Sequence, residues 1–189
     1  MENCYSALKF SALSAYLYLE WSFNSVRVHR KGSNLKLEFE YLADRSEDVP
    51  LVIDWWRTVW ADRMGSDIEL ARDQLHNSLS KTELPIHILA TLDGIPVGTA
   101  ALKRHELANV FPDYHYWLGS VFVKEDVRDG EIASQMSLHI VEMAKQLNLP
   151  HLYLQTINLG GGLYAKLGWE SVTVFTHMDE QALLMLRIL

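Results

Sequence analysis

The sequence contains a single cysteine, Cys4, among its 189 residues. One cysteine excludes a disulfide within the chain and a zinc site built from cysteine ligands. So little cysteine is typical of a reducing compartment, and we expect a cytoplasmic location. Histidine occurs eight times, but the histidines do not combine with carboxylates at metal-ligand spacing, so we expect no metal site.

Positive charge is also scarce. Lys and Arg together number 17 against 24 Asp and Glu, which gives a formal net charge of -7 and a pI near 5.6. Surfaces that bind nucleic acid are usually basic, so we expect no nucleic-acid partner. A local basic groove for an anionic cofactor is compatible with this total.

Long apolar runs are missing as well. The apolar segment FSALSAYLYL, residues 10–19, is too short to cross a bilayer, and Lys9 is the sole positive charge in front of it. We therefore expect neither a membrane anchor nor a cleaved signal peptide. The bulk composition, 49% hydrophobic and 22% charged, is that of one soluble globular domain.

Residues 1–33 differ from the remainder of the chain. Their apolar residues fall at helical spacing and predict an amphipathic helix: Tyr5, Leu8, Ala12, Leu13, Tyr16 and Leu17. A basic stretch, VRVHRKGSN, follows the helix as a linker. We therefore predict an N-terminal helical extension at 1–33 and a domain at 34–189, with partner binding or dimer formation as the alternative use of the extension.

From residue 35 the apolar pattern becomes regular. LKLEFEYL alternates apolar and charged residues as a half-buried strand does. Pro50 sits where a first helical turn begins, and Asp93-Gly94 is a strong hairpin signal. The predicted order is strand, two helices, three strands, helix, strand, short helix ending at Gly168 and two final strands, which is an α/β architecture.

The segment KEDVRDGEIASQM, residues 124–136, joins a predicted strand to a predicted helix. Backbone N–H groups and the helix dipole at such a junction favour an anion, and small residues let the backbone approach it. Gly130, Ala133 and Ser134 are small, and Arg128 adds a positive charge. The segment is therefore a candidate phosphate cradle, although a simple helix start would look similar.

Two motifs together resemble the GNAT acyltransferases, the acetyl-coenzyme A-dependent N-acetyltransferases. SVFVKEDVRDGEIASQM resembles their cofactor motif, and NLGGGLYAKLGW resembles their second motif. The matching positions are Val123, Arg128, Ile132 and Ala133 in the first motif, and Leu163, Tyr164, Lys166, Leu167, Gly168 and Trp169 in the second. Glu125, Asp129 and Glu131 depart from the first motif.

The resemblance implies the GNAT fold, a central mixed and mostly antiparallel sheet flanked by helices. It also implies transfer of an acetyl group from acetyl-CoA to a primary amine by direct attack in a ternary complex. The cofactor-binding residues that it implies are Val121, Phe122 and Val123 through their backbone, Arg128, Asp129, Gly130, Glu131, Ile132, Ala133 and Ser134 in the cradle, and Asn158 and Tyr164.

Two catalytic functions remain to be assigned. Tyr164 matches the family's usual general acid, which would donate to the departing thiolate. An amine acceptor must lose a proton, and Asp113 and His115 are our candidates for that base, followed by Glu106. Each of these three also fits an ordinary loop residue, and Asp113 is a candidate substrate contact as well.

A dense tryptophan cluster lies on the first predicted helix. Trp56 and Trp60 share its apolar face, so core packing is one interpretation, whereas Trp55 falls off that face. The resemblance offers another interpretation, because acceptor grooves in this family are often lined by the first two helices. Trp55, Trp56 and Trp60 are therefore candidate substrate contacts.

The leading hypothesis is a cytoplasmic N-acetyltransferase acting on a small-molecule amine. The alternative is a non-catalytic acyl-CoA-binding or interaction module that retains the fold, since Glu131 would repel a pyrophosphate. The sequence leaves a homodimer open and does not name the acceptor.

Overall fold

The computed structural model describes residues 26–30, 33–128 and 131–189. Its centre is a sheet of eight strands in the order β1-β2-β3-β4-β5-β6-β8-β7. Every neighbouring pair is antiparallel except β5 and β6, which are parallel. The architecture is therefore the mixed, mostly antiparallel sheet that the resemblance to the GNAT family implied.

The strands are β1 (Val26–Arg30), β2 (Ser33–Tyr41), β3 (Ile86–Leu92), β4 (Ile95–Lys103), β5 (Trp117–Val123), β6 (His151–Thr156), β7 (Glu170–His177) and β8 (Glu180–Ile188). The helices are α1 (Val49–Met64), α2 (Ile68–Asn77), α3 (Ile132–Gln146) and α4 (Gly162–Lys166). Short 3-10 turns η1 (Leu42–Asp44) and η2 (Ser46–Asp48) precede α1, and η3 (Glu125–Val127) precedes α3.

The first four strands form consecutive antiparallel pairs. Asp93 and Gly94 have φ of 48° and 80° and close the β3–β4 hairpin as predicted. β1, which the sequence assigned to a linker, pairs with β2 from Val26 opposite Leu37 to Arg30 opposite Ser33. The sheet thus begins before residue 34, while the predicted helix at the N-terminus lies outside the described residues.

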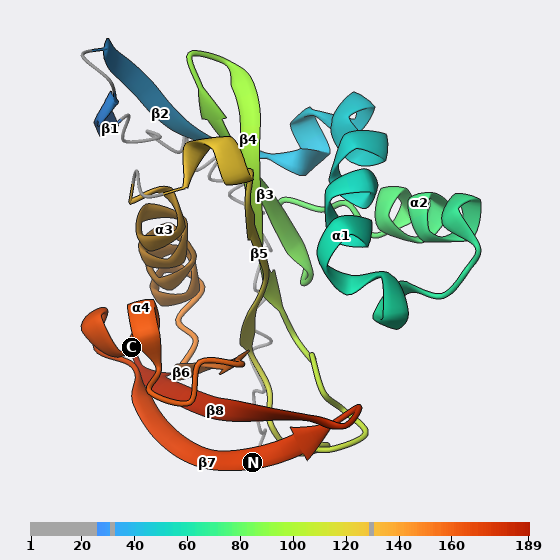
Figure 1. The fold of residues 1–189 in the computed structure, drawn as a ribbon, viewed down its shortest axis with the longest axis vertical. Coiled ribbons are helices and arrows are strands. Elements are labelled where there is room, and N and C mark those ends of the chain that lie inside the picture. The colour runs from blue at the N-terminus through green and yellow to red at the C-terminus, as the bar shows by residue number, and fades with distance from the viewer. Residues whose placement is uncertain (1–25, 31–32, 129–130) are drawn as a thin grey trace, which may run out of the picture.

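Helices cover the sheet on two faces (Figure 1). α3 lies on one face and buries Met136 and Ile140 against Ile88 and Leu118 of the sheet. α1 and α2 lie on the other face, where Val52 packs in a second cluster of buried side chains. Among the described residues, no helix is long and apolar enough to cross a membrane.

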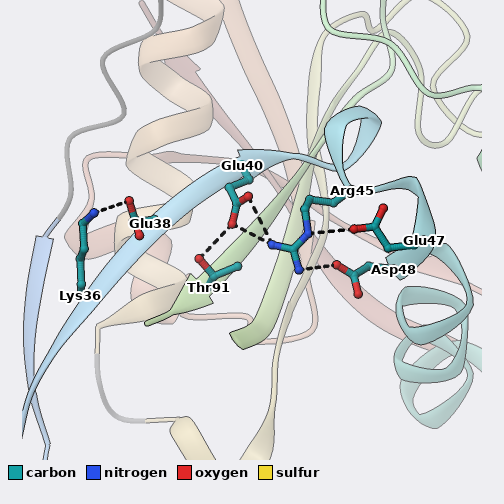
Figure 2. A network of polar contacts seen from close by, with 7 residues as sticks. All are labelled: Lys36, Glu38, Glu40, Arg45, Glu47, Asp48 and Thr91. Carbon is teal, nitrogen blue, oxygen red and sulfur yellow. Dashed lines mark hydrogen bonds and ion pairs between the residues drawn. The ribbon is translucent and has the colours of Figure 1, made fainter. Parts of the chain in front are cut away.

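An ion-pair network fixes the start of α1 (Figure 2). Arg45 contacts Glu40 of β2 at 3.0 Å and Asp48, immediately before α1, at 2.8 Å. Thr91 of β3 donates a hydrogen bond to Glu40 at 3.2 Å. The network ties the two strands to the beginning of α1 and so fixes where that helix crosses the sheet.

The sheet opens between β5 and β6. These strands pair only at Trp117 opposite Tyr153 and then diverge (Figure 1). Beyond Trp117, the side of β5 that faces β6 therefore carries backbone N–H and C=O groups with no strand partner. Such an unpaired edge can accept an extended chain as a further strand.

Candidate active site

A cavity of about 710 Å³ lies beside the opening in the sheet. Its walls come from α1, the β4–β5 connection, the unpaired part of β5, the end of β6, α4 and the β7–β8 turn. The side chains with polar or aromatic chemistry that line it are Trp56, Trp60, Asp62, Arg63, Lys103, Glu106, Ser120, Gln155, Thr156, Tyr164, His177 and Glu180.

Tyr164 reaches this cavity from α4. Its ring packs edge-on against Trp169, with ring centroids 6.3 Å apart. Burial raises the pKa of the Tyr164 hydroxyl from 10.0 to about 12. The phenol is therefore neutral at physiological pH and available as a hydrogen-bond donor inside the cavity.

Gly161 and Gly162, at the start of α4, allow close approach to β8 and to the preceding loop. A Cβ on Gly162 would lie 2.8 Å from the Asn158 side-chain nitrogen, and one on Gly161 would lie 2.8 Å from Met185. Both glycines have positive φ. Asn158 itself accepts a hydrogen bond from the Gly160 N–H at 3.0 Å. Close packing thus explains Gly161 and Gly162, and Asn158 organises the loop without lining the cavity.

Lys103 and Glu106 form an ion pair on the cavity wall. Their nitrogen and oxygen are 2.7 Å apart, and the side chains are 22% and 19% exposed. They lie directly over Gly119 of β5, where an added Cβ would be 2.6 Å from the Glu106 oxygen and 3.2 Å from the Lys103 nitrogen. Gly119 is therefore what allows both charged groups to rest against the strand.

A bulge follows Gly119 in β5. Ser120 has a φ of 52°, and the pairing with β4 slips so that Thr99 faces Phe122 while Ala101 faces Gly119. The extra residue reverses which side chains point to each face. Phe122 consequently packs towards α1, whereas Val123 packs towards α3.

The bulge also connects to the tryptophans of α1. The indole N–H of Trp56 donates to the Thr99 hydroxyl at 3.1 Å, and this hydroxyl donates to the Ser120 carbonyl at 3.0 Å. Trp56 and Trp60 line the cavity, whereas Trp55 is 9% exposed and stacks on Phe122 at 5.3 Å.

The tryptophan arrangement therefore differs from the one that helical spacing predicts. Trp56 and Trp60 form the aromatic wall, and Trp55 belongs to the core. Two features change which side of α1 is buried. The bulge turns Phe122 towards Trp55, and α1 is kinked at Trp60, where φ is -127° and ψ is 30°. A helical projection of the sequence contains neither feature.

The predicted phosphate cradle forms a smaller hollow of about 190 Å³. It is lined by Val123, Val127, Arg128, Glu131, Ile132, Ala133 and Ser134. The side chain of Arg128 donates to the Val123 carbonyl at 3.1 Å, which fixes the guanidinium at the end of β5. Glu131 immediately precedes α3 and has a left-handed φ of 59°. Asp129 and Gly130 lie outside the described residues.

The structure does not bring Asp113 and His115 to the large cavity. Asp113 is exposed in the β4–β5 connection. His115 lies with its Nδ1 3.3 Å from Nδ1 of His105. Glu106, from the same connection, does line the cavity. The described residues hold no group of three or more His, Cys, Asp or Glu side chains that could bind a metal.

Sequence reasoning did not single out Lys103, Gly119 or Ser120. The spacing of Lys103 and Glu106 gave no signal, because residues three apart face one another on a helix whereas Lys103 ends the strand β4. That the two side chains lie over a glycine of β5, in the cavity that Tyr164 also lines, depends on the β4–β5 register.

Comparisons with known proteins bear on this geometry. The sequence model of the Acetyltransferase (GNAT) family matches residues 50–169, whereas no curated protein matches significantly. Among solved structures, an aminoglycoside 6'-acetyltransferase type Ii is 16% identical, with a TM-score of 0.61 over 79% of this chain and 96% of its own.

Two further solved structures are similar. A ribosomal-protein-alanine N-acetyltransferase from Brucella melitensis is 18% identical, with a TM-score of 0.60 over 76% of this chain and 96% of its own. An aminoglycoside 6'-N-acetyltransferase complexed with coenzyme A is 15% identical, with a TM-score of 0.55 over 74% and 89%. At these identities the structures establish the fold. Together with the family match across most of the described domain, they show that the chain belongs to the GNAT acetyltransferase family.

Proposed function

We propose that this chain transfers an acetyl group from acetyl-CoA to a primary amine of a small-molecule acceptor. The observation that carries the proposal is the position of β5: its unpaired edge runs from the large cavity, which Val121 lines, to the small hollow, which Val123 lines. One strand thus joins a space suited to an acceptor with a hollow at a helix N-terminus. A cofactor with a long flexible arm and a diphosphate has the matching shape.

The cofactor would occupy both ends of that strand. In the proposal, the pantetheine arm pairs with the free backbone edge of Val121, Phe122 and Val123. The diphosphate lies at the start of α3, where the free N–H groups of Ile132, Ala133 and Ser134 and the helix dipole favour an anion. Arg128 and, outside the described residues, Asp129 and Gly130 complete the predicted contacts.

The chemistry needs a base for the acceptor and a donor for the thiolate. We assign the base to Glu106 in preference to Asp113 and His115, because Glu106 lines the same cavity as Tyr164. Tyr164 stabilises the departing sulfur by a hydrogen bond. The Tyr164 hydroxyl has a pKa of about 12, whereas a thiol has a reference pKa near 8.5. Proton transfer from the hydroxyl to the thiolate is therefore unfavourable, and stabilisation by the hydrogen bond precedes it.

The charge of the cavity supports a cationic acceptor. Its lining contains Asp62, Glu106 and Glu180 against Arg63 and Lys103. Arg63 pairs with Glu180 at 3.2 Å and Lys103 with Glu106 at 2.7 Å. The remaining carboxylate, together with two tryptophan faces, favours a protonated amine over an anion.

The test is steady-state acetyl transfer with purified protein, acetyl-CoA and a panel of primary amines, measured as free thiol released. Wild-type protein is expected to turn over at least one cationic amine, and Tyr164→Phe is expected to turn over about 10- to 100-fold more slowly while still binding acetyl-CoA in calorimetry. Absence of turnover with every amine would refute the proposal, and absence of binding as well would refute the cofactor assignment. We also propose that the protein acts in the cytoplasm, because its single cysteine is typical of a reducing compartment.

One observation favours the non-catalytic alternative. Glu131 lines the small hollow, and a carboxylate beside a diphosphate repels it. Under this alternative the chain would bind acyl-CoA or a protein partner without turnover, so wild type and Tyr164→Phe would be equally inactive in the amine assay and would bind acetyl-CoA equally well.

A further inference from the structure

We propose that Lys103 is itself an acceptor, so that the chain acetylates this lysine inside its own cavity. The inference rests on the proposed function, because the donor and the group that stabilises the thiolate are those of the amine reaction. It assigns a modification site to the cavity wall.

The first argument is position. The Lys103 nitrogen is directed into the cavity wall over Gly119 and lines the same space as Ser120, Val121 and Tyr164. Those three residues belong to the unpaired stretch of β5 and to α4, where the acetyl group of the cofactor would end. A primary amine is therefore built into the space that an external amine would enter.

The second argument is the partner of Lys103. The ammonium contacts Glu106 at 2.7 Å, and this carboxylate is the base proposed for external acceptors. A proton can thus pass from nitrogen to carboxylate without a further rearrangement. The pair is also shielded, with 22% and 19% of the two side chains exposed, which weakens competition from water.

The third argument is contrast with the other ion-paired lysines of the described chain. Lys36, Lys81, Lys124 and Lys145 have side chains that are 54%, 49%, 37% and 43% exposed. None of these four lines the cavity. Compared with these four lysines, Lys103 combines partial burial, a carboxylate partner and a position in the same cavity as Tyr164.

The step balances as a simple acyl transfer. The Lys103 nitrogen attacks the thioester carbonyl, an N–C bond forms and the C–S bond breaks. Of the two protons that the ammonium loses, one passes through Glu106 to solvent and the other ends on the sulfur, to which the Tyr164 hydroxyl donates. The products are acetyl-lysine and free coenzyme A, and no oxidant or reductant is required.

Acetylation would change the cavity in two ways. The lysine would lose its positive charge, so Glu106 would lose its partner and the lining would become more negative. The acetyl group would also occupy part of the space in which an external amine must bind. External amines present at saturating concentration should therefore slow the modification of Lys103.

The test incubates the full chain with acetyl-CoA and no added amine, then follows acetylation of each lysine by peptide mass spectrometry over time. Lys145 is the matched control, because it also contacts a glutamate three residues away, Glu142, at 2.7 Å, but lies on the exposed side of α3. Lys103 is expected to react about ten-fold faster than Lys145 despite its lower exposure, because the site would position it.

Two further measurements separate catalysis from spontaneous chemistry. Tyr164→Phe is expected to slow acetylation of Lys103 and leave that of Lys145 unchanged. The rate per molecule should not depend on protein concentration, because the acceptor belongs to the same chain.

Reaction of Lys103 no faster than Lys145, or equal rates in wild type and Tyr164→Phe, would overturn the inference. If added amines are acetylated while Lys103 stays unmodified, the self-acetylation alone is refuted. If neither an added amine nor Lys103 is acetylated, the proposed function fails with it.

Discussion

At the scale of single residues, Glu106 is the side chain whose charge the proposed reaction needs most. Glu106→Gln keeps the shape but cannot accept a proton, so kcat/KM for an amine is expected to fall about 100-fold near neutral pH. The loss should shrink at higher pH, where the free amine itself becomes abundant. A pH profile of kcat/KM measures this.

The matched control for Glu106 is Glu142→Gln, which breaks the equivalent pair with Lys145 on the surface of α3 and should leave kcat/KM unchanged. A loss in Glu106→Gln that is constant across pH would point to a structural function of the ion pair and count against the base assignment.

The raised pKa of Tyr164 makes a separate prediction. Since burial raises this pKa to about 12, the hydroxyl keeps its proton throughout the range in which enzymes are assayed. Wild-type activity should therefore not decline with pH up to about 10 through ionisation of Tyr164. Tyr164→Phe should lower kcat about 10- to 100-fold at every pH in that range. A decline in wild-type activity at alkaline pH that is absent in Tyr164→Phe would show that the Tyr164 hydroxyl ionises in this range and would contradict its raised pKa.

At the scale of elements, β5 shapes the cavity through Gly119, because a larger residue there would displace the side chains of Glu106 and Lys103. A Cβ at Gly119 meets the ends of two flexible side chains, Glu106 and Lys103, whereas a Cβ at Gly98 meets the Phe122 backbone carbonyl at 2.6 Å. Gly119→Ala should thus reduce turnover with little change in melting temperature, and Gly98→Ala should lower stability by about 1–3 kcal/mol. Thermal unfolding and steady-state kinetics of both variants measure this contrast. Equal loss of stability in the two would refute it.

The start of α3 combines backbone strain with an unfavourable charge. Glu131 has a φ of 59° and lines the small hollow. Glu131→Gln removes the charge alone and should tighten acetyl-CoA binding, because the repulsion of the diphosphate disappears. Glu131→Gly should tighten it as well and also raise stability by up to about 1 kcal/mol, since glycine adopts positive φ at no steric cost.

Calorimetry with acetyl-CoA and thermal unfolding measure these two effects separately. Unchanged affinity in both Glu131 variants would mean that this carboxylate does not face the diphosphate.

At the scale of the whole molecule, the buried His87 and the partly buried His139 make stability depend on pH. Burial, aided by Lys103, lowers the pKa of His87 from 6.5 to about 3, and burial lowers that of His139 from 6.5 to about 4. Below pH 6.5 the unfolded chain therefore binds protons that the folded chain does not. The free energy of unfolding should fall as pH falls through this window towards 3–4.

His87→Leu tests this effect on the whole fold, because the variant has no proton to gain at position 87. Its free energy of unfolding, measured by denaturant titration, should differ less between pH 7 and pH 5 than that of wild type. The same difference in both proteins would mean that His87 titrates alike in the folded and unfolded chains. The leucine also removes a buried Nδ1 that has no hydrogen-bond partner among the described residues.

The order of secondary structure followed from local signals. Alternation of apolar and polar residues predicts β2, helical spacing of apolar residues predicts α1 to α3, and turn residues such as Asp93 and Gly94 predict the hairpin. These patterns depend on neighbouring residues alone. The local signal for β1 was short: Val26 and Val28 alternate with Arg27 and His29 over only five residues, in a basic segment, and the strand became evident from its pairing with β2. A basic segment in isolation looks like a linker.

The sequence by itself determined the family and predicts the cradle, because both are carried by short motifs in which small or aromatic residues have fixed spacing. Only the tertiary structure decided that Glu106 and not Asp113 lines the cavity with Tyr164, and that Trp56 and not Trp55 faces it. These outcomes depend on the bulge at Ser120 and the opening between β5 and β6. Both are set by pairing between strands far apart in the chain, and local periodicity contains no information about that register.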